Sequence, residues 1–378
     1  MKFKGKKLNK KVIISLACIG VLILSVLTSG FGFFSNEHGK FVKVGDMHYA
    51  RSGHRAVLLQ DGRVLILGGT QDANAEIYTP QTKKFKLIEK YGDKNGSTLT
   101  LLNNGQVLLT GLAEHAELFD PKTEKFIPTG KMNYPRYKHT ATLLKDGRVL
   151  IVGGEALTSL KGKVLLKERI FYEYSEIYDP KIGKFELGSK INNKRTYHSA
   201  ILLDNSNVLI VGGENYAERI LISELYDTKN NKFIEIGDTK NIKLTSDLIK
   251  LQNGKVLIFN AGQKFEIYDP SSRNFDFFMP DTVVERSFNP VLLKDGNILF
   301  IAGSKKERWY YVGSNETEIL NPYKKELVKG PNLHNKRGRP TATLLEDGTV
   351  LITGGLNTQT EKGLKSAEIF IPSNKIKE

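Results

Sequence analysis

The sequence predicts an all-β protein, a seven-bladed β-propeller preceded by one hydrophobic helix. Three observations carry this prediction. One strand pattern recurs seven times from Phe41 onward, each copy joins two apolar runs by a short turn, and the last copy lacks a strand that the start of the array supplies. Because a fixed period indicates a repeat architecture, the 378 residues are counted as one ring and not as two or three domains.

The composition excludes several classes of protein. Apolar residues make up 40% and charged residues 26% of the chain, which is typical of a folded globular protein. The single cysteine, Cys18, excludes an internal disulfide and a cysteine-based zinc site. The net charge of +15 favours anionic surfaces without identifying a partner. The sequence contains neither an arginine-rich helix nor a Cys/His finger, so nucleic acid is not an expected partner.

A hydrophobic segment lies near the N-terminus. Residues 1–11 form a basic region, and residues 12–34 carry no charge, so a helix over them would cross the roughly 30 Å core of a bilayer. The preceding lysines would stay in the cytoplasm, which puts the rest of the chain outside. We therefore expect a single-pass cell-membrane protein. Cleavage as a signal peptide near residues 28–30, giving a secreted protein, is the alternative. A lipoprotein is disfavoured because Cys18 lies early in the segment.

The clearest copy of the repeat begins at His139. Its Leu-Leu-x-Asp-Gly-x-Val-Leu-Ile stretch predicts two apolar strands around Asp146 and Gly147, joined by a two-residue type I′ turn. Continuous apolar runs are typical of strands that are buried on both faces between neighbouring sheets. In the fourth copy, residues 204–207 replace the Asp-Gly pair. Because asparagine tolerates the left-handed region, we expect the hairpin there too.

A third and a fourth strand complete each copy. The Gly-Gly pair that ends the second strand in four copies permits close approach of backbones where the sheets converge. The third strand carries a Glu-Ile-Tyr motif, and the proline that usually follows ends it because proline cannot donate to the ladder. The motif begins at Glu76, Glu117, Glu176, Glu224, Glu266, Glu318 and Glu368.

The seventh copy breaks off without its fourth strand. Residues 39–47 match residues 124–132 in register, so the N-terminal strand should complete the last blade. A ring needs such a closure because its end blades would otherwise expose open sheet edges. The sequence thus divides into the two N-terminal segments above, a short linker at 35–40 and a propeller at 41–378.

The repeats from Phe41 onward resemble kelch repeats of the bacterial type, and the propeller is similar to the central domain of galactose oxidase. The resemblance does not imply the activity of that enzyme family, which uses a copper ion with a cysteine–tyrosine crosslink. The only cysteine here, Cys18, lies in the hydrophobic segment, so copper oxidase activity is rejected. We expect a monomer that has neither a metal nor another cofactor.

The loops after the second strands predict a working face. They lie on the same face as the residues that precede each first strand, and they vary most in length. The longest occupy residues 155–174 and 304–316. Aromatic residues in these insertions would stack on sugars, anchor a protein partner, or pack the loops onto the propeller. They are Trp309, Tyr310 and Tyr311, with Tyr172, Tyr174 and Tyr216 in other insertions.

A basic residue stands three positions before the His139 position in six copies. We expect the arginines among them around the mouth of the central channel, where they would bind a carboxylate, sulfate or phosphate. The alternative is architectural, since Arg-x-x-His belongs to the repeat itself. The histidines, one per blade, are too far apart for a zinc site. The arginines are Arg51, Arg136, Arg195 and Arg337.

Glu155 and Glu214 follow the Gly-Gly pairs of adjacent blades, and paired carboxylates suit acid–base chemistry on sugars. No further catalytic constellation accompanies them, so no residue is assigned as catalytic. The sequence predicts a cell-surface or membrane-anchored binding module that recognises a glycan or a protein through the arginine-rimmed loop face. The alternatives are a carbohydrate-active enzyme, such as the sialic acid epimerases or mutarotases among similar kelch propellers, and a structural subunit of an envelope assembly.

Overall fold

The computed structural model describes residues 38–69, 74–90, 97–111, 115–158, 168–216, 218–240, 246–259, 264–283, 289–301, 303–307, 310–357, 360 and 362–373. Every regular element in these ranges is a β-strand, so the all-β prediction is confirmed for them. The predicted membrane segment at 12–34 lies outside these ranges. Within them, no helix has the length and apolar character needed to cross a bilayer.

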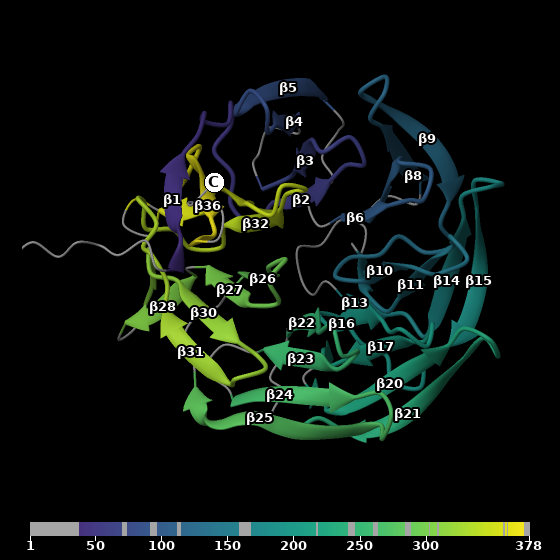
Figure 1. Cartoon of the computed structure of the whole chain (residues 1–378). Helices are drawn as coiled ribbons and strands as arrows, with labels where there is room; N and C mark the ends of the chain where they lie inside the picture. Colours follow the sequence, from purple (N-terminus) through teal and green to yellow (C-terminus); the bar gives the residue numbers. More distant parts are fainter. Residues whose placement is uncertain are drawn as a thin grey trace, which may run out of the picture.

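The strands in these ranges form seven four-stranded antiparallel sheets, arranged as blades around a central axis (Figure 1). The innermost strands of neighbouring blades contact one another all the way round the ring. From the innermost strand outward, the blades are β2 (Arg55–Leu58), β3 (Val64–Leu67), β4 (Asn74–Thr79) and β5 (Lys84–Lys90); β6 (Thr98–Leu101), β7 (Val107–Thr110), β8 (His115–Asp120) and β9 (Lys125–Lys131); β10 (Thr140–Leu143), β11 (Val149–Val152), β14 (Tyr174–Asp179) and β15 (Lys184–Lys190); β16 (Ser199–Leu202), β17 (Val208–Val211), β20 (Ile222–Asp227) and β21 (Lys232–Asp238); β22 (Asp247–Lys250), β23 (Val256–Phe259), β24 (Lys264–Asp269) and β25 (Asn274–Val283); β26 (Asn289–Leu292), β27 (Ile298–Ile301), β30 (Glu318–Asn321) and β31 (Glu326–Lys329); and β32 (Thr341–Leu344), β33 (Val350–Thr353), β36 (Ala367–Ile371) and β1 (Lys40–Lys43).

The last blade closes the ring as predicted. Its outermost strand is β1, which pairs antiparallel with β36 and sets Phe41 opposite Phe370. The two rings lie 5.3 Å apart, and five other blades repeat this aromatic contact between their third and fourth strands. The N-terminal strand therefore supplies the same core contact that each continuous blade makes within itself.

The turn between the first two strands differs from the predicted type. In the first blade, the N–H of Gly62 donates to the carbonyl of Leu59, and only Gly62 has a positive φ (81°). This is a three-residue hairpin loop with glycine in the left-handed position, and the predicted two-residue type I′ turn is wrong. Asp61 contributes through its side chain, which accepts the N–H of Arg63 at 3.0 Å. In the fourth blade Ser206, not asparagine, takes the left-handed position (72°).

The second strand of every blade is buried along its full length, which agrees with the continuous apolar runs. The glycine pair that follows it meets the loop before the first strand. Gly154 has φ +89°, and a Cβ placed there would lie 2.9 Å from the carbonyl oxygen of Tyr137. Only glycine fits where these two backbone segments approach each other, because it lacks a Cβ and adopts positive φ without strain.

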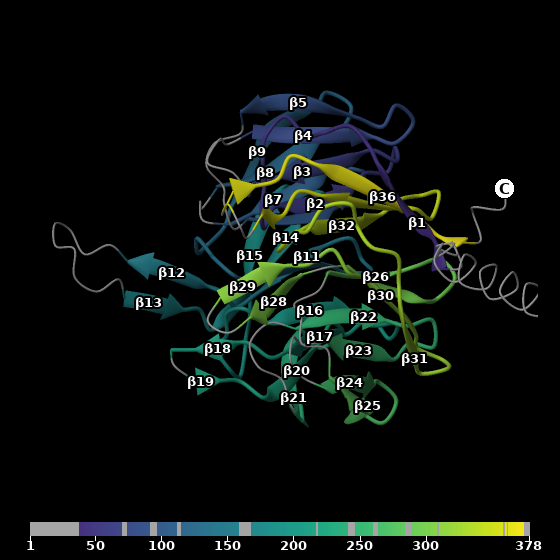
Figure 2. The ribbon, with the colours of Figure 1, turned by 90° about the vertical axis from the view of Figure 1, so that its left-hand side faces the viewer.

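Four two-stranded hairpins are inserted after second strands, all at the ends opposite the glycine turns. We call this side the loop face and the opposite side the turn face. Figure 2 shows β12, β13, β18 and β19 projecting from one side, with β1 on the other. Lys40 begins β1 on the turn face, since β1 runs antiparallel to β36. The hairpins pair β12 (Glu155–Thr158) with β13 (Glu168–Phe171), β18 (Glu214–Asn215) with β19 (Glu218–Arg219), β28 (Ser304–Glu307) with β29 (Tyr310–Gly313), and β34 (Leu356–Asn357) with β35 (Lys362–Gly363).

Candidate functional site

The four predicted arginines do not line an open channel mouth. Their side chains are fully buried, and each guanidinium lies between the second and third strands of its own blade. In the third blade, Nη1 of Arg136 donates to the carbonyl of Gly153 at 2.8 Å, and Nη2 lies 3.0 Å from Oε1 of Glu176. The other pairs are Arg51 with Glu76, Arg195 with Glu224 and Arg337 with Glu368. We call these pairs the Arg–Glu layer.

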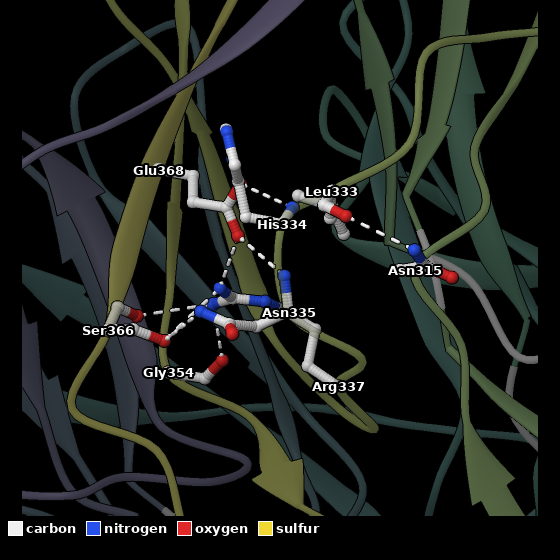
Figure 3. Close-up of polar contacts among 8 residues, drawn as sticks. All are labelled: Asn315, Leu333, His334, Asn335, Arg337, Gly354, Ser366 and Glu368. Atoms are coloured by element: carbon white, nitrogen blue, oxygen red, sulfur yellow. Dashed lines mark hydrogen bonds and ion pairs between the residues drawn. The ribbon is translucent and has the colours of Figure 1, made fainter.

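Figure 3 shows one pair of this layer in the last blade. Nη2 of Arg337 lies 2.7 Å from Oε1 of Glu368, and Oε2 of the same carboxylate accepts the backbone N–H of His334 at 2.9 Å. Burial opposes ionisation of Glu368, but the hydrogen bonds from His334 and the charge of Arg337 outweigh it and lower its pKa. The carboxylate thus ties the third strand to the chain that enters the blade. These contacts fit the architectural interpretation of the arginines.

The histidines of the same element join neighbouring blades. Nε2 of His54 lies 2.7 Å from the hydroxyl of Thr353 in the preceding blade, and Nε2 of His139 lies 2.9 Å from that of Thr110. Burial, reinforced by the nearby arginines, lowers the pKa of both rings to about 3. His198 repeats the contact with Thr140. These neutral rings therefore hold the ring of blades together.

The residues one position before these histidines, or before Pro340 in the last blade, are more accessible: Tyr197 and Arg339 are exposed, and Lys138 is partly buried. Lys138 (φ 58°), Tyr197 (56°) and Arg339 (48°) all adopt the left-handed conformation, and Gly53 occupies the same position in the first blade. The N–H of Tyr197 donates to the carbonyl of Lys138 at 3.2 Å, and that of Gly53 to Arg339 at 3.3 Å. Left-handed residues other than glycine are strained and cluster at functional sites. Here they present a lysine, a tyrosine and an arginine around the channel.

Glu155 and Glu214 both form ion pairs with Arg169 on the loop face. Arg169, from strand β13, contacts the buried carboxylate of Glu155 through Nε and that of Glu214 through Nη2 at 3.0 Å. Nζ of Lys138 is also 2.9 Å from Glu155. The two carboxylates are thus bridged by an arginine, which fits a structural ion network better than an acid–base pair.

The same network positions exposed aromatic side chains. Nζ of Lys138 lies 3.9 Å from the ring centroid of Tyr197, and Tyr216 packs on Phe171 at 4.8 Å. Tyr216 is 68% exposed and has φ 44°. Its carbonyl accepts Nη1 of Arg169 at 3.3 Å. We call this group the blade 3–4 cluster; its members are Lys138, Glu155, Arg169, Phe171, Tyr197, Glu214 and Tyr216.

The predicted aromatic site in the sixth blade is not described at the side-chain level. Trp309 lies outside the described residues. Tyr310 and Tyr311 form part of β29, but their side chains lie outside the described part as well. Tyr172, from another insertion, stacks on Tyr134 at 4.8 Å and lies over Arg136, so its ring packs the loop down onto the propeller.

The channel itself carries two charged residues that sequence reasoning missed. Arg55 and Asp247 begin the innermost strands of the first and fifth blades, and both are exposed. Enclosure by the ring of strands raises the pKa of Asp247 to about 6, and the charge of Arg55 partly opposes this rise. The available signal was a departure from the repeat, because four other copies have threonine or serine at this position.

Comparisons with known proteins agree with this architecture. No family model matches the chain. The chain is 21% identical over 174 residues to the Kelch repeat-containing protein kel-10 of Caenorhabditis elegans, a match that covers 42% of this chain and 28% of that protein. Among solved structures, it is similar to a fungal alcohol oxidase of the AA5 family in complex with copper. The TM-score is 0.67 at 16% identity, over 89% of this chain and 76% of the oxidase.

The chain is a seven-bladed β-propeller whose repeats are similar to those of a kelch repeat-containing protein. At these identities the likeness carries the fold and not the chemistry. What a propeller binds has to be argued from its site and not from its fold. In this propeller the loop face carries candidate side chains in the blade 3–4 cluster and at the channel mouth.

Proposed function

We propose that this kelch propeller is a cell-surface or membrane-anchored binding module that recognises a glycan or protein ligand through its loop face. The observation that carries the proposal is the exposed Tyr216. A ring contact with Phe171 and a hydrogen bond from Arg169 hold it in a left-handed conformation. A rigid exposed tyrosine costs little conformational entropy when it anchors a ligand.

The surroundings of Tyr216 support this role. Ile170 is 43% exposed on the same hairpin as Phe171, and Tyr197 is exposed beside Lys138. Aromatic and aliphatic side chains bordered by ion pairs are typical of the centre and rim of a protein interface. Sugars also stack on such rings. The aliphatic neighbour favours a protein ligand, and a glycan is the other outcome of the test.

The geometry of the ring also suits an anchored module. Lys40 enters on the turn face, whereas the inserted hairpins lie on the opposite face. If residues 12–34 cross a membrane, a short linker at 35–40 joins them to the turn face. The loop face then points away from the bilayer, where it is accessible to ligands.

The test uses the full-length chain in detergent on arrays of glycans and of extracellular protein domains. The variant Tyr216→Ala is compared with Tyr323→Ala, which removes a 52% exposed tyrosine from the turn face. We expect a ligand whose affinity falls at least about tenfold in the first variant and is unchanged in the second, since tyrosine anchors commonly contribute more than about 1.4 kcal/mol. A ligand bound equally by both variants would place recognition elsewhere.

A further inference from the structure

The first position of the innermost strand is occupied differently in different blades. In four blades a hydroxyl at this position bonds to the neighbouring blade. The hydroxyl of Thr140 lies 2.9 Å from Nε2 of His198, and that of Thr341 donates to the carbonyl of His54 at 2.9 Å. Thr98 and Ser199 make equivalent contacts with His139 and with the carbonyl of Ser246. At this position a hydroxyl serves the architecture.

Arg55, Asp247 and Asn289 occupy the same position in the three remaining blades. Within the described part of the chain, the side chains of Arg55 and Asp247 make neither a hydrogen bond nor an ion pair, although both residues are exposed. Residues repeated in every blade are explained by the ring, but residues that depart from the repeat are not. Charged groups left unpaired in an enclosed channel suit a ligand.

A cavity of about 360 Å³ borders Arg55 and Asn289, within the range of about 300–1,000 Å³ typical of small-molecule sites. It lies between the first, sixth and seventh blades, and its polar lining includes Arg55, Arg339, Asn289 and Thr341. Arg339 is exposed and holds its left-handed conformation at the mouth. Two guanidinium groups and an amide thus line one pocket that opens to solvent.

We propose that this cavity binds a small hydroxylated carboxylate, such as a sugar acid. Arg55 and Arg339 bind the carboxylate, because a guanidinium donates two parallel hydrogen bonds to it. Asn289 binds a hydroxyl group through its side-chain amide, because the hydroxyl of Thr341 already donates to the carbonyl of His54. The site is separate from the blade 3–4 cluster, so it stands whether or not that cluster binds a ligand.

Asp247 makes binding at this site depend on pH. Asp247 begins the innermost strand of the fifth blade, as Arg55 begins that of the first, and the charge of Arg55 acts on its carboxylate. The innermost strands on either side of it, β16 and β26, carry no charged residue. His54 and His139, which also lie within the field of Arg55, stay neutral because their pKa values are about 3. Protonation of Asp247 below about pH 6 removes a negative charge that competes with the ligand for Arg55, so affinity rises as the pH falls.

The probe is D-glucuronate, titrated calorimetrically into the full-length chain in detergent, with D-glucose as the uncharged control of the same size. We expect saturable binding of glucuronate and none of glucose at pH 6. Absence of saturable heat with glucuronate, or equal binding of the two sugars, overturns the proposal.

Two variants locate the site. Arg55→Gln and Arg339→Gly should each weaken glucuronate binding at least about tenfold, because each removes a charged hydrogen-bond donor to the carboxylate. The matched control is Arg273→Gly, which removes an exposed arginine with φ 57° on the turn face. Unchanged affinity in both channel variants, or an equal loss in Arg273→Gly, contradicts the assignment.

The role of Asp247 has its own readout. Wild-type protein should bind glucuronate several-fold more tightly at pH 5 than at pH 8, a range in which an ordinary sugar carboxylate stays ionised. Asp247→Asn should bind equally at both values. A pH dependence that survives in this variant assigns the proton to another group and removes Asp247 from the site.

Discussion

Arg51 and Arg55 stand four residues apart on the first blade and have opposite environments. Arg51 is fully buried, and its guanidinium bonds the carbonyl of Gly68 and the carboxylate of Glu76. Arg55 is exposed in the central channel and has no ion pair within the described residues. Three other blades have an arginine at the position of Arg51, and no other blade has one at the position of Arg55. In a repeat protein, residues that recur in the repeat therefore indicate an architectural role, and residues that depart from it are candidates for function.

We expect the largest loss of stability from the removal of one buried arginine of the Arg–Glu layer. Arg136→Met leaves the carboxylate of Glu176 buried without its cation, and breaking a buried pair in this way costs about 3–5 kcal/mol. We expect that loss in the free energy of unfolding, measured by urea denaturation. Arg55→Met, the control, should change it by less than about 0.5 kcal/mol. Similar losses of unfolding free energy in the two variants would mean that the buried and the exposed arginine contribute equally to the fold.

The buried histidines should make the stability of the propeller sensitive to acid. Their folded-state pKa of about 3 lies below the value of 6.5 in the unfolded chain, so the unfolded state binds more protons between these values. Stability is therefore complete above about pH 6.5 and falls as the pH drops towards 3, by up to about 1.4 kcal/mol per pH unit for each histidine. His139→Gln should flatten this slope in denaturation curves at pH 4 to 7. An unchanged slope would mean that His139 is protonated in the fold.

Asp247 should behave in the opposite way. Its pKa is raised to about 6, so the folded state keeps a proton that the unfolded chain has lost, and stability falls as the pH rises from about 4 to 6. Asp247→Asn should therefore stabilise the protein at pH 8, by roughly 1 kcal/mol once water in the channel is allowed for. The difference from wild type should vanish near pH 3.5. A variant that is less stable at pH 8 would show that the carboxylate has a partner.

The smallest expected effect concerns the left-handed residues. Arg339→Gly relieves a backbone strain of about 1–2 kcal/mol, but glycine costs about 0.5–1 kcal/mol of conformational entropy. The melting temperature should stay the same or rise slightly, as it should in Arg273→Gly. A loss of more than about 1 kcal/mol would mean that the Arg339 side chain supports the fold.

Sequence reasoning was most accurate where a feature recurs. The blade number and the pairing of Phe41 with Phe370 followed from register alone, since a closed ring leaves one place for the missing strand. It failed at the turn, because Asp-Gly is compatible with two hairpin types and the pair does not distinguish them. The choice between two interpretations of the arginines also lay beyond it. The presence of an arginine in the sequence does not show whether its guanidinium pairs with a carboxylate or contacts water.

The all-β class, the sevenfold repeat and its closure follow from the sequence alone, because strand period and turn residues are local signals that a single copy already contains. The tertiary structure decided which side chains are free. Glu76 and Arg51 pair because the third strand returns beside the loop that enters the blade, and the charge of Arg55 acts on Asp247, without an ion pair, because the ring brings the first and fifth blades to one channel. Such meetings depend on the curvature of the whole array, which no single repeat encodes.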